Sequence, residues 1–223
     1  MPDFNIIRSF VDRYRSSFTC EEEVGEYSSG FLPRMVRKTV RDFCISGKGR
    51  LLEVGSGEGL FLVDLSRANP HIFMVGIDPW LDIIKESKKR IFRGRHENIE
   101  LVSALGQVLP FGDEEFDYVV CINLLLNLPD ILEVQSTIEE IVRVCKSDGR
   151  FYFDFRNKLN PLINLGYRLV RFHDPEIKVP VRSYFISDIK RILWRLKVQK
   201  FEFRGLAFPL AQIAPAVLVS GMK

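Results

Sequence analysis

A short apolar run that leads directly into closely spaced glycines constrains the fold of this 223-residue chain more than any other feature. Leu51-Leu52-Glu53-Val54 is typical of a buried parallel strand, and Gly55, Gly57 and Gly59 follow at every second position before a helix-like run from Leu60. Glycines let a backbone approach a ligand closely because they carry no Cβ, and the first turn of a helix presents free N–H groups. The order strand, glycine turn, helix therefore predicts an α/β fold with a ligand site at this turn. A tight turn without a ligand is the alternative.

Strand-like and helix-like patterns alternate along the rest of the chain. The expected strands after the first cover residues 71–78, 99–102, 116–122, 150–155, 201–204 and 216–219, and the expected helices cover residues 80–92, 129–145 and 187–196. Such alternation predicts a doubly wound, mostly parallel, seven-stranded sheet with helices on both faces.

Residues 1–48 precede the first strand and are expected to form a helical N-terminal arm. Apolar residues fall on one helical face between Phe4 and Phe18, and a second helix is expected from about Phe31 to Phe43. The arm is expected either to pack against the domain or to form a lid over the ligand.

Composition narrows the class of protein. Hydrophobic residues make up 46% and charged residues 27%, which predicts a folded core, and the net charge of +3 is too small to indicate nucleic acid. The four cysteines form no C-x-x-C pair, so neither a metal site nor disulfides are expected. The chain shows no signal-peptide pattern and no apolar stretch long enough for a transmembrane segment, which favours a cytoplasmic protein.

The glycine spacing separates two classes of nucleotide site. The dinucleotide fingerprint G-x-G-x-x-G requires a glycine where Leu60 stands. The pattern E-x-G-x-G-x-G from Glu53 to Gly59 instead resembles motif I of the class I S-adenosylmethionine (SAM) methyltransferases. Residues 105–120 (L-G-Q-V-L-P-F, then F-D-Y-V-V) and 143–149 (R-V-C-K-S-D-G) resemble later stretches of the same family. The resemblance spans residues 51 to about 155 and implies a Rossmann-like fold, SAM as cofactor and methyl transfer.

The resemblance also implies the cofactor-binding residues. Asp78 ends the second strand, where a carboxylate can accept hydrogen bonds from both ribose hydroxyls, although it is also placed to cap the next helix. Leu105 replaces the family's usual aspartate beside the adenine. The complete expected set is Glu53, Gly55, Ser56, Gly57, Gly59, Asp78, Pro79, Leu105, Gly106, Gln107, Asn123 and Leu124.

The acceptor side is less defined. We expect one domain over residues 1–223, with a cofactor-binding core at 49–155 and an acceptor-site insert at 156–187 whose apolar and cationic residues suit a small amphipathic acceptor. The insert is alternatively a packing helix or a membrane-surface helix. His173, Asp174 and Asn123 are weak catalytic candidates, and a surface or packing role is the alternative for His173. The alternative function is a catalytically inactive SAM-binding or regulatory protein on the same fold.

Overall fold

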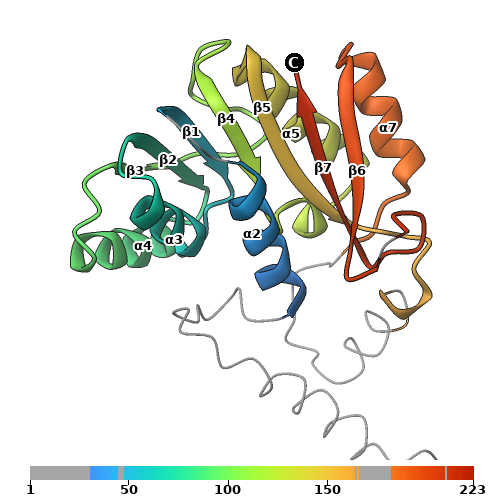
Figure 1. Ribbon diagram of the computed structural model, residues 1–223, viewed down its shortest axis with the longest axis horizontal. Coiled ribbons are helices and arrows are strands. Elements are labelled where there is room, and N and C mark those ends of the chain that lie inside the picture. The colour runs from blue at the N-terminus through green and yellow to red at the C-terminus, as the bar shows by residue number, and fades with distance from the viewer. Residues whose placement is uncertain (1–30, 45–47, 164, 166–181, 209) are drawn as a thin grey trace, which may run out of the picture.

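A seven-stranded sheet with the order β3-β2-β1-β4-β5-β7-β6 runs through the protein, whose structure is a computed structural model (Figure 1). The structure describes residues 31–44, 48–163, 165, 182–208 and 210–223. The strands are β1 (Gly49–Val54), β2 (Ile72–Asp78), β3 (Ile99–Ser103), β4 (Phe116–Cys121), β5 (Cys145–Arg156), β6 (Lys200–Leu206) and β7 (Ala216–Met222). The helices are α2 (Phe31–Cys44), α3 (Leu60–Ala68), α4 (Leu81–Arg93), the short 3-10 helix η1 (Leu125–Asn127), α5 (Ile131–Val144) and α7 (Ile186–Arg195).

The sheet is mixed. Strands β3, β2, β1, β4 and β5 pair in parallel, whereas β7 pairs antiparallel with both β5 and β6. The expected seven-stranded α/β sheet is confirmed, but the expectation of a mostly parallel sheet is wrong at the β7–β6 edge. The physical reason is the connection at residues 207–215, because a parallel pair needs a longer crossover than these few residues provide.

Successive side chains of β1 pack against helices on opposite faces of the sheet. Leu52 and Val54 join a core cluster that includes residues of α5 and α7, whereas Leu51 joins a second cluster that includes residues of α2, α3 and α4. Successive side chains of a strand point to opposite faces, so each face of the sheet is buried by its own helices (Figure 1). The layered, doubly wound arrangement follows from this pattern.

Helix α2 is the described part of the N-terminal arm. It spans Phe31–Cys44, which confirms the helix expected from about residue 31 to 43, and it buries Val36 and Val40 in the second cluster. Helix α2 therefore packs against this face of the sheet. The other expected helix of the arm, between Phe4 and Phe18, lies outside the described residues.

The order of the strands fixes where a ligand can bind. The chain runs outward from β1 through β2 to β3, then returns to β4 on the other side of β1. Ligands of open α/β sheets bind beyond the carboxyl ends of the parallel strands, next to such a reversal. In this protein those strand ends are Val54, Asp78, Ser103 and Cys121.

Candidate functional site

The glycine turn after β1 is tied to the end of β2. The backbone N–H groups of Gly55 and Ser56 donate to the carbonyl of Ile77 at 2.9 and 2.8 Å. Helix α3 follows directly, with Gly59 as its N-cap residue and no side chain there to cap it. An N-terminus of this kind leaves N–H groups that a ligand can satisfy.

Gly55 and Gly57 are required for different reasons. Both have positive φ, 77° and 51°, where an L side chain is disfavoured. A Cβ at position 55 would lie 3.1 Å from the side chain of Leu124, whereas a Cβ at position 57 would meet no atom within 4 Å. Gly55 therefore serves packing, and Gly57 borders open space at the carboxyl edge of the sheet.

Asp78 connects β2 to the glycine turn. Its carboxylate accepts a hydrogen bond from the Gly57 N–H at 3.1 Å and another from the Trp80 N–H at 3.0 Å. The N-cap residue of α4 is Trp80, so the alternative role of Asp78 as the helix cap is not realised. Burial raises the pKa of Asp78, and the two N–H bonds oppose that rise. A buried carboxylate thus stands directly beside Gly57.

Glu53 and Ser56 carry buried polar atoms at this turn. Glu53 is 3% exposed and Ser56 is 6% exposed. In the part of the chain that the structure describes, Glu53 Oε2 and Ser56 Oγ accept and donate no hydrogen bond. Burial raises the pKa of Glu53 well above its ordinary value; Asp78 adds to the rise and Arg37 opposes it. Unsatisfied buried groups are costly, so this pair fits a ligand that brings a hydrogen-bond donor.

The loop after β3 forms a compact turn. Leu105 and Val108 form an isolated bridge, and the Val108 N–H donates to the Leu105 carbonyl at 3.2 Å. Leu105 is 55% exposed, so it is a surface residue of the carboxyl edge and not a core residue. Gly106 is buried against the end of β1, because a Cβ there would lie 2.9 Å from Val54 Cγ1. Gln107 is a half-buried member of the same turn.

Leu124 joins the loops that follow three strands. Its side chain lies 3.1 Å from the Cβ position of Gly55 and 3.5 Å from that of Gly106. Leu124 itself follows β4, so the turns after β1, β3 and β4 meet at this one side chain. Of the remaining predicted residues, Pro79 is exposed beside Asp78, and Gly59 packs on Ser87 of α4.

Asn123 belongs to a buried polar network that bridges β4 and β5. Its backbone has a φ of 55° and its N–H donates to Asp154 Oδ1 at 2.6 Å. Arg156 donates to Asp154 Oδ2 at 2.7 Å and to Asn123 Oδ1 at 2.8 Å. Arginine only donates, so this contact turns the Asn123 amide oxygen toward Arg156. Burial raises the pKa of Asp154, opposed by Arg156.

Asp154 and Arg156 are not among the site residues that the sequence predicts. Asp154 is fully buried and Arg156 is 4% exposed, and both belong to the strand run Phe151-Tyr152-Phe153-Asp154-Phe155-Arg156. Two opposite charges at alternate positions of an otherwise aromatic strand are the signal, because buried charges are normally paired.

The insert joins the core through a hydrogen-bonded neck. Asn157 and Tyr184 form an isolated parallel bridge, in which the Tyr184 N–H donates to the Arg156 carbonyl and the Lys158 N–H donates to the Tyr184 carbonyl. The Tyr184 hydroxyl also donates to the carbonyl of Leu128 at 3.3 Å. The ends of the insert therefore lie beside the loop after β4. His173 and Asp174 lie outside the described residues. Within the described ranges, no group of three or more His, Cys, Asp or Glu side chains is placed to hold a metal ion.

Sequence comparisons agree with this geometry. Residues 52–153 match the family model described as a methyltransferase domain. The ubiquinone/menaquinone biosynthesis C-methyltransferase UbiE of Syntrophotalea carbinolica is 26% identical over 135 residues, which is 60% of this chain and 55% of the relative. A demethylmenaquinone methyltransferase of Staphylococcus saprophyticus is 32% identical over 114 residues, which is 51% of this chain and 47% of the relative. The chain thus spans about half the length of the curated relatives it matches.

Solved structures share the fold. The PH0226 protein of Pyrococcus horikoshii superimposes with a TM-score of 0.68 at 20% identity, covering 95% of this chain and 99% of that one. A SAM-dependent methyltransferase of Thermotoga maritima, described as a possible histamine N-methyltransferase, gives 0.64 at 17% identity, covering 99% and 100%. The matched region contains the glycine turn, Asp78, the Leu105 turn and Asn123. The resemblance seen in the motifs agrees with these findings: residues 52–153 match a methyltransferase domain, and the solved structures share the fold.

Proposed function

We propose that the protein transfers a methyl group from SAM to a small, amphipathic acceptor. The observation that carries the proposal is the pairing of Gly57 with Asp78. The Gly57 N–H is already bonded to the Asp78 carboxylate, and the direction of its missing Cβ is open. The exposed backbone at Gly57 can approach a ligand closely, and the Asp78 carboxylate beside it can accept hydrogen bonds. Together they suit a ligand that carries hydroxyl groups and a positively charged group.

The residues at the carboxyl edge suit different parts of the cofactor. We assign the ribose hydroxyls to Asp78 and the adenine to the turn at residues 105–107. We assign the methionine part to Gly55 and Gly57. Its ammonium group would then satisfy the orphaned Glu53 Oε2, directly or through water, and Ser56 would supply a hydroxyl contact.

SAM supplies a methyl group bound to a positively charged sulfur, so the protein need not generate a reactive species of its own. The chain's residues bind and orient. Positioning of two reactants can supply roughly 7–11 kcal/mol of a barrier in the best cases. Asn123 and Leu124 are suited to that role, because one is locked by Asp154 and Arg156 and the other contacts two of the cofactor turns.

The acceptor side is assigned to the ends of the insert and the loop after β4. Leu159, Leu162 and Leu165 are exposed at the start of the insert, which suits an acceptor with an apolar part. One relative named above is a ubiquinone/menaquinone biosynthesis C-methyltransferase and the other a demethylmenaquinone methyltransferase, which favours a small molecule over a nucleic acid. No helix in the described ranges is long and apolar enough to cross a bilayer. Shallow contact with a membrane surface and a cytoplasmic location stay part of the proposal.

Calorimetry with SAM, S-adenosylhomocysteine (SAH) and NAD tests the cofactor assignment. We expect SAM and SAH to bind and NAD not to bind. Tight NAD binding without a response to SAM would overturn the proposal. Incubation of metabolite extract with SAM labelled on its methyl group then tests turnover. Cofactor binding without transfer to any acceptor in the extract would favour the inactive SAM-binding alternative, for which the replacement of the family's aspartate by Leu105 is the supporting observation.

A further inference from the structure

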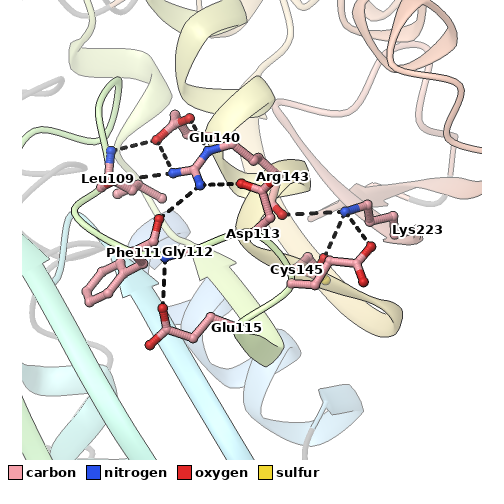
Figure 2. Close-up of polar contacts among 10 residues, drawn as sticks. Leu109, Phe111, Gly112, Asp113, Glu115, Glu140, Arg143, Cys145 and Lys223 are labelled. Atoms are coloured by element: carbon pink, nitrogen blue, oxygen red, sulfur yellow. Dashed lines mark hydrogen bonds and ion pairs between the residues drawn. The ribbon is translucent and has the colours of Figure 1, made fainter.

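Arg143, near the end of α5, uses every donor of its guanidinium on one loop and one neighbour (Figure 2). Its Nε and Nη2 donate to the Glu140 carboxylate at 2.6 and 2.8 Å. Its Nη1 donates to the Phe111 carbonyl at 2.9 Å and to Asp113 at 2.8 Å, and its Nη2 also donates to the Leu109 carbonyl at 3.3 Å. Arginine has five N–H donors, and all five have acceptors here.

Glu140 completes the arrangement from the other side. Its Oε2 accepts the Leu109 N–H at 2.6 Å, so both the N–H and the carbonyl of Leu109 are held by α5. The hydrogen bond from Arg143 lowers the pKa of Glu140, so its carboxylate is ionised at neutral pH. Charge-assisted bonds of this kind are the stronger ones in proteins. We call Glu140 and Arg143 the α5 clamp.

The α5 clamp begins where the turn after β3 ends. Leu105–Val108 protrudes at the carboxyl edge, and Leu105 and Val108 are 55% and 72% exposed. Upstream, the turn is tied to β2 by the Ala104 N–H, which donates to the Asp78 carbonyl at 3.3 Å. Downstream, its first anchor to α5 by hydrogen bonds is Leu109. Within the turn, Gly106 is packed against Val54 and Leu124 while Leu105 and Val108 are exposed, so the position of the exposed residues also depends on the two ends.

One face of α5 follows the loop along its length. A Cβ on Gly106 would lie 3.5 Å from Thr137 Cγ2, and Glu140 and Arg143 hold the residues that come next. Positions 137, 140 and 143 are three apart and therefore lie on one side of a helix. This helix face acts as a template for the whole segment from Gly106 to Asp113.

We propose that Glu140 and Arg143 are positioning residues for cofactor binding, which hold the Leu105–Val108 turn in its binding geometry before the ligand arrives. The inference rests on the proposed function and extends it, because these two side chains would act on SAM affinity through the loop without touching the ligand. Preorganisation of this kind raises affinity by removing the ordering cost of the loop.

The test compares SAH affinity with local hydrogen exchange in matched variants. Arg143→Lys keeps the charge but loses at least two of the five donors, and Glu140→Gln keeps the size but loses the charge. Lys146→Met is the matched control, because it breaks an ion pair of 2.7 Å with Asp117 at the other end of the sheet, away from the turn. Asp113→Asn is a second control, since it removes the charge of an exposed side chain bonded to Arg143 and leaves the bonds from Arg143 to the loop backbone in place.

We expect Arg143→Lys and Glu140→Gln each to weaken SAH binding about tenfold, the effect of one or two lost hydrogen bonds. Amides of residues 105–112 should exchange faster in both apo variants, while those of residues 55–59 stay unchanged. The double variant should lose no more affinity than the weaker-binding single variant, because the two side chains act as one unit. Both controls should bind SAH as the wild type does.

If Arg143→Lys and Glu140→Gln both bind SAH as tightly as the Lys146→Met control does, the inference is overturned, and the α5 clamp only stabilises the fold. If Arg143→Lys fails to fold, Glu140→Gln decides the outcome by the same two measurements. Failure of the wild type to bind SAH would overturn the proposed function, and the inference with it.

Discussion

Gly57→Ala separates the two explanations of the glycine turn, because its effects on the free and the liganded protein differ. In the free protein the new Cβ meets no atom within 4 Å, so no steric penalty arises. The remaining cost comes from φ, which is 51° and lies in the left-handed region. An L side chain there costs roughly 1–2 kcal/mol relative to glycine. For a chain of this size that corresponds to a fall in Tm of a few degrees, at about 2–4 °C for each kcal/mol.

Cofactor binding should suffer more than stability. The open direction at Gly57 is the space assigned to the cofactor, so the methyl group of alanine would have to be accommodated there. Overpacking of a close contact costs typically 1–3 kcal/mol, which corresponds to a loss of SAH affinity of about 5-fold to more than 100-fold. Calorimetry with SAH, carried out well below the Tm of the variant, measures this loss independently of the fall in stability.

Gly55→Ala gives a comparison of stability, and Gly112→Ala gives the control. Gly55→Ala places its Cβ 3.1 Å from Leu124 at a φ of 77°, so we expect a larger fall in Tm than for Gly57→Ala. Gly112→Ala meets only Glu115 Oε2, at 3.7 Å, and its Tm and SAH affinity should both match the wild type. If Gly57→Ala loses the expected stability but binds SAH as the wild type does, the turn is a structural connection and the reasoning about its open side is refuted.

Substitutions at three other positions test the rest of the site. Asp78→Ala should weaken SAH binding by about 1–3 kcal/mol, through loss of charge-assisted bonds, and change apo stability less; a large fall in apo Tm with unchanged affinity would make Asp78 structural only. Burial raises the pKa of the Glu53 carboxyl group in the folded protein. The unfolded chain therefore loses the carboxyl proton at a lower pH than the folded chain does, and the free energy of unfolding falls as the pH rises between the two pKa values. Glu53→Gln should therefore raise the apo Tm at pH 7 and weaken SAH binding, and the gain in Tm should shrink as the pH falls through the folded-state pKa; a gain that is constant with pH would contradict this. Leu105→Asp should leave SAH affinity the same or modestly tighter, and loss of the fold in thermal melts would contradict the 55% exposure of Leu105.

The strand, turn and helix that carry the proposed cofactor site are predictable from the sequence because their signals are local. Glu53 to Gly59 are contiguous, and a strand followed by alternate glycines and a helix leaves few ways to fold. The sequence predicts the ends of helices less accurately. Helix α5 begins at Ile131, with Asp130 as its N-cap, two residues after the expected start at Pro129. Asp130 accepts hydrogen bonds from the Leu132 and Glu133 N–H groups, and this capping contact decided the boundary.

The reversed direction of β7 is not predicted, because the alternation of apolar and polar residues indicates which side chains are buried and not how the strands pair. The patterns of both strands were read correctly from residues 201–204 and 216–219. Whether two strands run parallel depends on the connection between them, and the short link at residues 207–215 permits only the antiparallel arrangement. The network of Asn123, Asp154 and Arg156 is not predicted for a related reason, since the two bonds that Asn123 makes in it join residues more than thirty positions apart.

Several polar groups at the carboxyl edge are costly to the fold. Glu53 and Ser56 are buried with unsatisfied atoms, Asn123 has a positive φ, and Asp154 and Arg156 form a buried ion pair that carries a desolvation penalty. Away from this edge the two clusters that flank the sheet are built from apolar side chains. A sequence selected for stability alone would remove such features, because well-packed apolar residues at these positions are often neutral or stabilising. A ligand that forms hydrogen bonds with Glu53 and Ser56 would explain why these features lie at the strand ends. At concentrations above its Kd, such a ligand stabilises the folded state by an amount that grows with the logarithm of its concentration.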